Sequence, residues 1–358
     1  MKTAISHTLA ALIGAIVVGV MWVFFGPGVT DVEINRSDQV DRNSLVELDG
    51  IEKKPSQPDD RQSEVFDFLK DKPLSRAAAD VWLRGIPRNS LFADRFAAAG
   101  MLLVDIDLIR TSLEQEPENP FALYAAANLS GLEPEEQKEF RQRFFEVDSS
   151  NALAGYLYAQ SLAQSGQMDE AISVLNETSH RTGFENYAQH FMLNAQDVFL
   201  AVGNSYSEAR ALSAAQVVVP YANDMRELGD SLIWQALTLS EEDSVEVRAL
   251  VSSMGERLSG IGLGRYAVEY LSGISIERAG LEGLPEDYPS PYDGLSVAQA
   301  RRSIDDEYDR VVRVLRETRP LIDAVNTDPD LWSRYAERIN LCGEVNAIDW
   351  LKAELDDE

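Results

Sequence analysis

Two segments of this chain share one pattern, a helix end followed by a polar turn and a new helix start. They are "SLEQEPENP" at residues 112–120 and "FFEVDSSNA" at residues 144–152, which begin 32 residues apart. From Ser63 onward, apolar residues recur at helical spacing, and no alternating run of apolar and polar residues indicates a strand. The sequence therefore predicts an all-α body whose helices are connected by short polar turns.

The helices that follow the two turns also match each other. Tyr124 aligns with Tyr156, and Asn128 aligns with Gln160, at the same offset of 32 residues. This pattern resembles the tetratricopeptide repeat (TPR), a helix–turn–helix unit of about 34 residues. The resemblance covers residues 105–178. It implies a degenerate TPR-like superhelix, in which each helix pair buries its apolar face against its neighbours.

In TPR proteins the first helix of each pair lines the concave, partner-binding face. The resemblance therefore places Tyr124, Asn128, Tyr156 and Gln160 on one wall of a groove for a protein or peptide partner. Tyrosine rings and amides suit an extended peptide, because they stack against it and form hydrogen bonds with it. The alternative is that the two tyrosines pack between helices. These positions carry no lysine or arginine, which argues against an acidic tail as the ligand.

An uncharged apolar run, "LAALIGAIVVGVMWVFFG", occupies residues 9–26. As a helix it would be about 27 Å long, close to the ~30 Å hydrocarbon thickness of a bilayer. A cleaved signal peptide is the alternative. The apolar core of a signal peptide is shorter and ends in small residues, whereas this run ends in Trp22, Phe24 and Phe25. We therefore expect an uncleaved, single-pass transmembrane anchor.

Charged residues on either side of the anchor predict its orientation. Lys2 precedes the run, and Asp31 and Glu33 follow it. By the positive-inside rule the N-terminus stays in the cytoplasm and the body lies outside it, which in a bacterium means the periplasmic side of the inner membrane. Small residues spaced four apart in the anchor also allow self-association. The expected order is a cytoplasmic N-terminus (1–8), the transmembrane anchor (9–26), a flexible linker (27–62), a TPR-like helical-repeat domain (63–280), a Pro/Tyr loop (281–295) and C-terminal helices (296–358).

The chain is strongly acidic, with 60 Asp and Glu residues against 32 Lys and Arg residues and a net charge of −28. Such a charge repels phosphate backbones, so we expect no nucleic-acid partner. The acidity is typical of a need for solubility, and a basic protein partner or a loosely held cation is the alternative. With one cysteine, Cys342, and three histidines, the sequence predicts no metal site, and no motif in it indicates a cofactor.

Residues 305–321 form a basic stripe on this acidic chain. Its arginines follow one another at three-residue steps, namely Arg310, Arg313, Arg316 and Arg319. Asp306 and Asp309 each lie four residues before an arginine, an arrangement that favours ion pairs along a helix. We expect a solvated, self-paired face, with a site for an anion or an acidic partner as the alternative.

The segment before this helix, residues 284–296, is rich in proline and contains Tyr288 and Tyr292. We expect it to be a connector, with a partner-binding loop as the alternative. Ser296 and Gln299 predict a capping box at the start of the following long helix.

The sequence contains no nucleophile elbow, no H-E-x-x-H pair and no phosphate-binding Walker loop. The interpretation that follows is a membrane-anchored periplasmic scaffold, not an enzyme, that mediates protein–protein interaction in the assembly or support of an envelope complex. The alternative is a glycan-active envelope enzyme with a carboxylate site in an α-helical superhelix, because a pair of catalytic carboxylates has no fixed sequence spacing.

Overall fold

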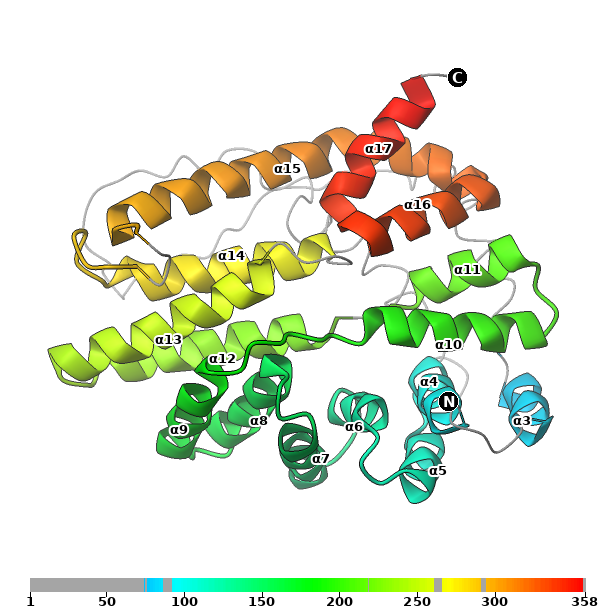
Figure 1. Cartoon of the computed structure of the whole chain (residues 1–358), viewed down its shortest axis with the longest axis horizontal. Helices are drawn as coiled ribbons and strands as arrows, with labels where there is room; N and C mark the ends of the chain where they lie inside the picture. Colours follow the sequence, from blue (N-terminus) through cyan, green and yellow to red (C-terminus); the bar gives the residue numbers. More distant parts are fainter. Residues whose placement is uncertain are drawn as a thin grey trace, which may run out of the picture. The chain divides into compact units, whose positions relative to one another are not determined.

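The computed structural model describes residues 74, 76–85, 92–217, 219–260, 266–290 and 294–356, all within the compact unit Leu74–Glu358. These residues form fifteen α-helices and no strand, so the predicted all-α class is confirmed (Figure 1). No helix in the described part of the chain is both long enough and apolar enough to cross a membrane. The expected cytoplasmic segment, anchor and linker (1–62) lie outside the described residues.

The first seven described helices pack largely in consecutive pairs. They are α3 (Arg76–Gly85), α4 (Phe92–Leu103), α5 (Ile106–Gln115), α6 (Pro120–Ala127), α7 (Pro134–Val147), α8 (Ala152–Gln164) and α9 (Met168–Ser179). Helix α4 packs on α5, α6 on α7, and α8 on α9. Neighbouring pairs touch where α4 meets α6 and where α7 meets α8, and Figure 1 shows the pairs arranged in a row.

Asparagine side chains cap the N-termini of two of these helices. Asn119 Oδ1 accepts a hydrogen bond from the Ala122 backbone amide at the start of α6 (2.9 Å), and Asn151 Oδ1 accepts one from Leu153 at the start of α8 (3.1 Å). Each cap satisfies an amide that the helix itself leaves unpaired. The two polar turns expected from the sequence therefore lie between α5 and α6 and between α7 and α8.

The later helices pack against one side of the row formed by the earlier ones and against one another. They are α10 (Ala188–Ala201), α11 (Tyr206–Ala215), α12 (Tyr221–Ala236), α13 (Glu241–Ser259), α14 (Ala267–Glu282), α15 (Val297–Thr327), α16 (Pro329–Cys342) and α17 (Glu344–Asp356). Helix α10 packs on α4 and α12 packs on α8, while α11 packs on α16 and α15 on α17. In Figure 1, α10 and α12 run along one side of the row that contains α4, α6 and α8.

Helices α12, α13 and α14 form a tightly packed unit. Helix α14 is antiparallel to α13, because Gly280 lies against Ser252 and Gly273 lies against Ser259. It is parallel to α12, because Gly229 lies against Ile276 and the start of α12 is hydrogen-bonded to the start of α14. The C-terminal ends of α12 and α14 and the N-terminal end of α13 therefore lie at one end of this unit.

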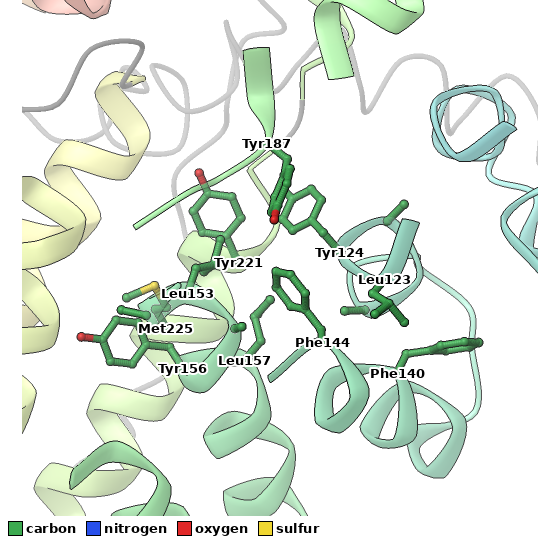
Figure 2. Close-up of a cluster of buried hydrophobic side chains, with 14 of the residues drawn as sticks. Leu123, Tyr124, Phe140, Phe144, Leu153, Tyr156, Leu157, Tyr187, Tyr221 and Met225 are labelled. Atoms are coloured by element: carbon green, nitrogen blue, oxygen red, sulfur yellow. The ribbon is translucent and has the colours of Figure 1, made fainter. Parts of the chain in front are cut away.

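One hydrophobic core joins most of these helices. It includes Ala97 on α4, continues through α6, α8 and α12, and reaches Ala336 on α16. Figure 2 shows its centre, where the rings of Tyr124, Tyr187 and Tyr221 lie close together. Because α12 shares this core with the earlier helices, the side of the row that it covers is closed to solvent.

Candidate functional site

The two tyrosines of the expected groove wall are buried. Tyr124 is 2% exposed and Tyr156 is 3% exposed. The Tyr124 ring centre lies 5.2 Å from that of Tyr187 and 6.5 Å from that of Tyr221 (Figure 2). Burial raises the pKa of Tyr124, and it raises the pKa of Tyr156 to about 12 despite the opposing charge of Arg257. Neither ring is placed to stack on a ligand.

The two amides of the expected wall are hydrogen-bonded within the protein. Gln160 is 2% exposed and donates to Glu227 on α12 (3.3 Å). Asn128 donates to the backbone oxygen of Tyr124 at the end of α6 (2.9 Å). The expectation of an open wall at these four positions therefore has to be corrected, and packing between helices, the alternative given for the tyrosines, describes their surroundings.

Helix α12 packs on α8 and covers the residues expected to line the groove. Arg141 on α7, which is 2% exposed, donates to Asp224 on α12 (2.5 Å) and to the backbone oxygen of Ala127 (3.1 Å). Burial raises the pKa of Asp224, and Arg141 opposes that rise. Two acidic residues of α12 are thus bound by the earlier helices, Asp224 by Arg141 and Glu227 by the Gln160 amide. Periodicity in α6 and α8 could not reveal this, because Asp224 is 83 residues from Arg141.

A group of tyrosines and carboxylates surrounds the start of α14. Glu269 is fully buried and accepts hydrogen bonds from the Tyr221 hydroxyl, from Asn186 Nδ2 (2.9 Å) and from the Tyr266 amide (2.8 Å). Glu344 accepts from the Ala267 amide (2.7 Å), and burial raises its pKa. These bonds hold α14 against α12 and α17, so we interpret the group as structural.

Possible sites for chemistry are sparse among the described residues. No three His, Cys, Asp or Glu side chains in this part of the chain gather as they would to hold a metal ion. A hollow lined by Glu116–Pro120 lies in the turn before α6 and is open to solvent. Its two carboxylates, Glu116 and Glu118, belong to the same short turn. A catalytic pair is expected instead in a deep pocket, where the two carboxylates face a bound sugar.

His190 and Asp94 form a pair that joins α10 to α4. His190 Nε2 lies 2.8 Å from Asp94 Oδ2, and Asn119 donates to the other oxygen (2.8 Å). The contact with Asp94 raises the pKa of His190, while burial opposes the rise. Burial disfavours the charged form of Asp94, but its hydrogen bonds outweigh that effect and lower its pKa. The ion pair between Arg95 and Asp197 (3.0 Å) joins the same two helices, so both contacts hold α10 against α4.

The basic stripe lies on α15. Arg310 is paired with Glu307 (2.7 Å) and not with Asp306 as expected, because Glu307 also accepts from the Tyr270 hydroxyl on α14. The hydrogen bond with Glu307 raises the pKa of Arg310. Arg313 and Arg316 are exposed, and the side chain of Arg319 lies outside the described residues. The stripe is therefore partly paired, as a solvated face would be.

A different surface stands out on α12. Trp234 is 67% exposed near the end of α12, and Leu237, the residue that directly follows the helix, is 63% exposed. The core-facing residues of α12 include Leu228, Leu232 and Ala236, which follow one another at four-residue steps. Trp234 falls outside this stripe, so a helical projection of the sequence was the signal that could have found it. We name Trp234 and Leu237 the α12 patch.

Comparison of the chain with protein-family models, with curated proteins and with solved structures gives no match.

Proposed function

We propose that this chain is a membrane-anchored scaffold that binds another protein through the surface of its helical body. The observation that supports the proposal is the α12 patch, two large apolar side chains left exposed at the C-terminal end of α12. Exposed apolar side chains that neighbour one another often mark protein–protein contacts. Tryptophan is also enriched among the residues that dominate binding energy.

The proposal includes a degenerate TPR-like arrangement for α4 to α9. Three consecutive helix pairs, the polar turns between them and the buried Tyr124 and Tyr156 are consistent with it. The groove of that arrangement would be filled by α12, so the proposed partner binds elsewhere. This differs from the use of a concave face that the family resemblance implies.

The membrane part of the proposal rests on the sequence alone. The uncharged run at residues 9–26 would anchor the chain, and the charges around it would leave the body outside the cytoplasm. In a bacterium the scaffold would then work at the periplasmic face of the inner membrane, beside an envelope complex. The glycan-active alternative gains no support from the two buried carboxylates at the start of α14, Glu269 and Glu344, which are hydrogen-bonded within the core.

The experiment is purification of the tagged full chain from native membranes in a mild detergent. Light scattering measures the mass of the complex, and mass spectrometry identifies its components. We expect a second protein in stoichiometric amount. A chain that elutes alone, at the mass of one copy, would contradict the scaffold.

The same preparation is then made with Trp234→Ala/Leu237→Ala. A matched control is Leu193→Ala/Leu200→Ala, which removes two exposed leucines from α10. We expect the partner to be lost from the first variant and kept by the second. Fractionation of the cells and extraction at alkaline pH test the anchor, because a spanning helix stays in the membrane pellet.

A further inference from the structure

We propose that the α12 patch is the docking site for a basic amphipathic segment of the partner protein, one that presents leucine-like side chains beside lysines or arginines. This inference rests on the proposed function and adds the chemistry of the partner. The two exposed apolar side chains and the charges at the same end of α12 support this inference.

The apolar part of the site is small and well placed. Trp234 lies on the last turn of α12, and Leu237 follows three residues later as the C-cap with a helical backbone, so both lie on the same side of the helix end. The helix is anchored behind them by Leu232 and Ala236, which are 0% and 2% exposed. A large aromatic on a rigid helix loses little conformational freedom when a partner covers it, which favours binding.

Carboxylates gather at the same end of the α12–α14 unit. Asp230 lies one turn before Trp234, and the first turn of α13 follows Leu237 after a short link. Exposed acidic residues at this end include Asp230, Glu241, Glu242, Glu282, Glu286 and Asp287. Among the described contacts, none of these six side chains forms an ion pair. These six carboxylates form an acidic rim at the same end of the unit as the apolar patch, and none of them has a direct cationic partner among the described contacts.

Two arginines at this end are bound within the protein, while Arg302 is exposed and donates to the Ala298 backbone oxygen of its own helix. Arg301 donates to the backbone oxygens of Leu281 and Leu284 at the end of α14, and Arg248 is largely buried against Gly283. Neither is free to pair with the acidic rim. A partner that brings its own lysines or arginines would supply the missing charges.

Charge also argues against other occupants. A second copy of this chain carries the same net charge of −28, and an anionic membrane surface is repelled for the same reason. A basic segment is attracted at a distance by the whole molecule and held locally by the rim. Leucine-like side chains on one face of that segment would cover Trp234 and Leu237.

The test uses the full chain in nanodiscs of zwitterionic lipid, with empty discs as the blank. The probe is a fluorescent peptide of about 18 residues whose leucines fall on one face of a helix and whose lysines fall on the opposite face. A second peptide has glutamate in place of every lysine. We expect the lysine peptide to bind, more weakly as salt rises, and the glutamate peptide not to bind.

Two variants and two matched controls localise the binding. Trp234→Ala/Leu237→Ala should weaken binding of the lysine peptide by about tenfold or more. Glu241→Gln/Glu242→Gln should also weaken it severalfold. Glu135→Gln/Glu139→Gln removes the same charge from exposed positions on α7, and Leu193→Ala/Leu200→Ala removes apolar surface from α10; neither should change binding.

The remaining outcomes overturn the inference. Equal weakening by the α7 control would show that the peptide responds to net charge alone. Equal binding of the glutamate peptide would remove the charge argument. If neither peptide binds and Trp234→Ala/Leu237→Ala turns a dimer into a monomer in light scattering, the occupant is a second copy. A native partner that persists in both patch variants would sink this inference but leave the scaffold itself intact.

Discussion

At the scale of single residues, Glu277 shows how one buried carboxyl group affects the stability of the body. It is 2% exposed on α14, and its Oε2 atom accepts a hydrogen bond from Ser259 (3.4 Å). Its other oxygen has no partner among the described residues. Burial, together with the charge of Glu256, raises the pKa of Glu277 to about 8. The group is therefore mostly neutral at pH 7.

We predict that Glu277→Gln stabilises the protein at alkaline pH. The raised pKa favours the protonated folded state, and this stability is complete below the ordinary pKa of 4.5 and lost as the pH rises through about 8. Glutamine has no proton to lose, so the free energy of unfolding should exceed that of the parent by several kcal/mol at about pH 9. Urea unfolding between pH 5 and about 9 measures the difference.

The control for this prediction is Glu139→Gln, which changes an exposed carboxylate on α7. Its stability should follow the parent at every pH. Parallel pH profiles for Glu277→Gln and the parent would show that Glu277 is not protonated in the folded state.

Residues whose role is local could be predicted from the sequence. The capping box at the start of α15 is present, because Ser296 accepts from the Gln299 amide and Gln299 accepts from the Ser296 amide. Tyr124 and Gln160 could not be placed in the same way. Their surroundings depend on α12, and Gln160 meets a residue 67 positions away. Spacing within one helix says which residues share a face, but not what covers that face.

At the scale of helices, Arg141 is the contact that joins the earlier helices to α12. We predict that Arg141→Ala lowers the free energy of unfolding by about 3 to 5 kcal/mol, because it leaves Asp224 without its partner in a largely buried place. Asp224→Ala should cost less, because Arg141 keeps its hydrogen bonds to the backbone oxygens of Ala127 and Leu157. The double variant should cost less than the sum of the two. Chemical unfolding of all four proteins at neutral pH measures the coupling.

The matched pair for this cycle is Arg110 and Glu136, which also join two helices, α5 and α7. Their side chains are 48% and 32% exposed, so solvent screens the interaction. The coupling between them should be much weaker than that between Arg141 and Asp224. Equal coupling in both cycles would mean that burial does not strengthen the Arg141 contact.

The packing of α13 on α14 depends on glycine. A Cβ atom at Gly255 would lie 2.7 Å from the Cα atom of Glu277, where only backbone could move to make room. A Cβ atom at Gly229 would lie 3.4 Å from a methyl group of Ile276, which is ordinary contact. We predict that Gly255→Ala lowers the thermal midpoint by several degrees. Gly229→Ala should leave it unchanged or raise it, because alanine favours the helix by about 1 kcal/mol.

Circular dichroism melts of the two alanine variants test this prediction. A similar change in both would show that the helices are not in close contact at Gly255. The existence of the helices and the two polar turns followed from apolar spacing and from the repeated pattern of helix end, polar turn and helix start. The crossing of α10 and α12 over the earlier helices did not, because it depends on contacts between distant parts of the sequence.

At the scale of the whole molecule, the hydrophobic core and the excess of negative charge have opposite effects on the stability of the folded body. The core joins helices from α4 to α16, which favours a compact body. The chain has 60 acidic residues against 32 basic ones, so negative charges within the folded body repel one another. Ion pairs such as Lys352 with Glu317 neutralise only a part of this charge. The acidic composition thus opposes the stability that the core provides.

We predict that salt stabilises this protein, although salt weakens individual ion pairs. Screening acts on the many repulsive contacts more than on the few attractive ones, so the thermal midpoint should rise by a few degrees between about 20 mM and 300 mM NaCl. The rise should shrink near pH 5, close to the sequence pI of about 4.4, because the net charge is then small. Magnesium chloride at the same ionic strength should give the same midpoint as NaCl. A much larger rise with magnesium would instead mean that a cation binds at a defined place on the acidic surface.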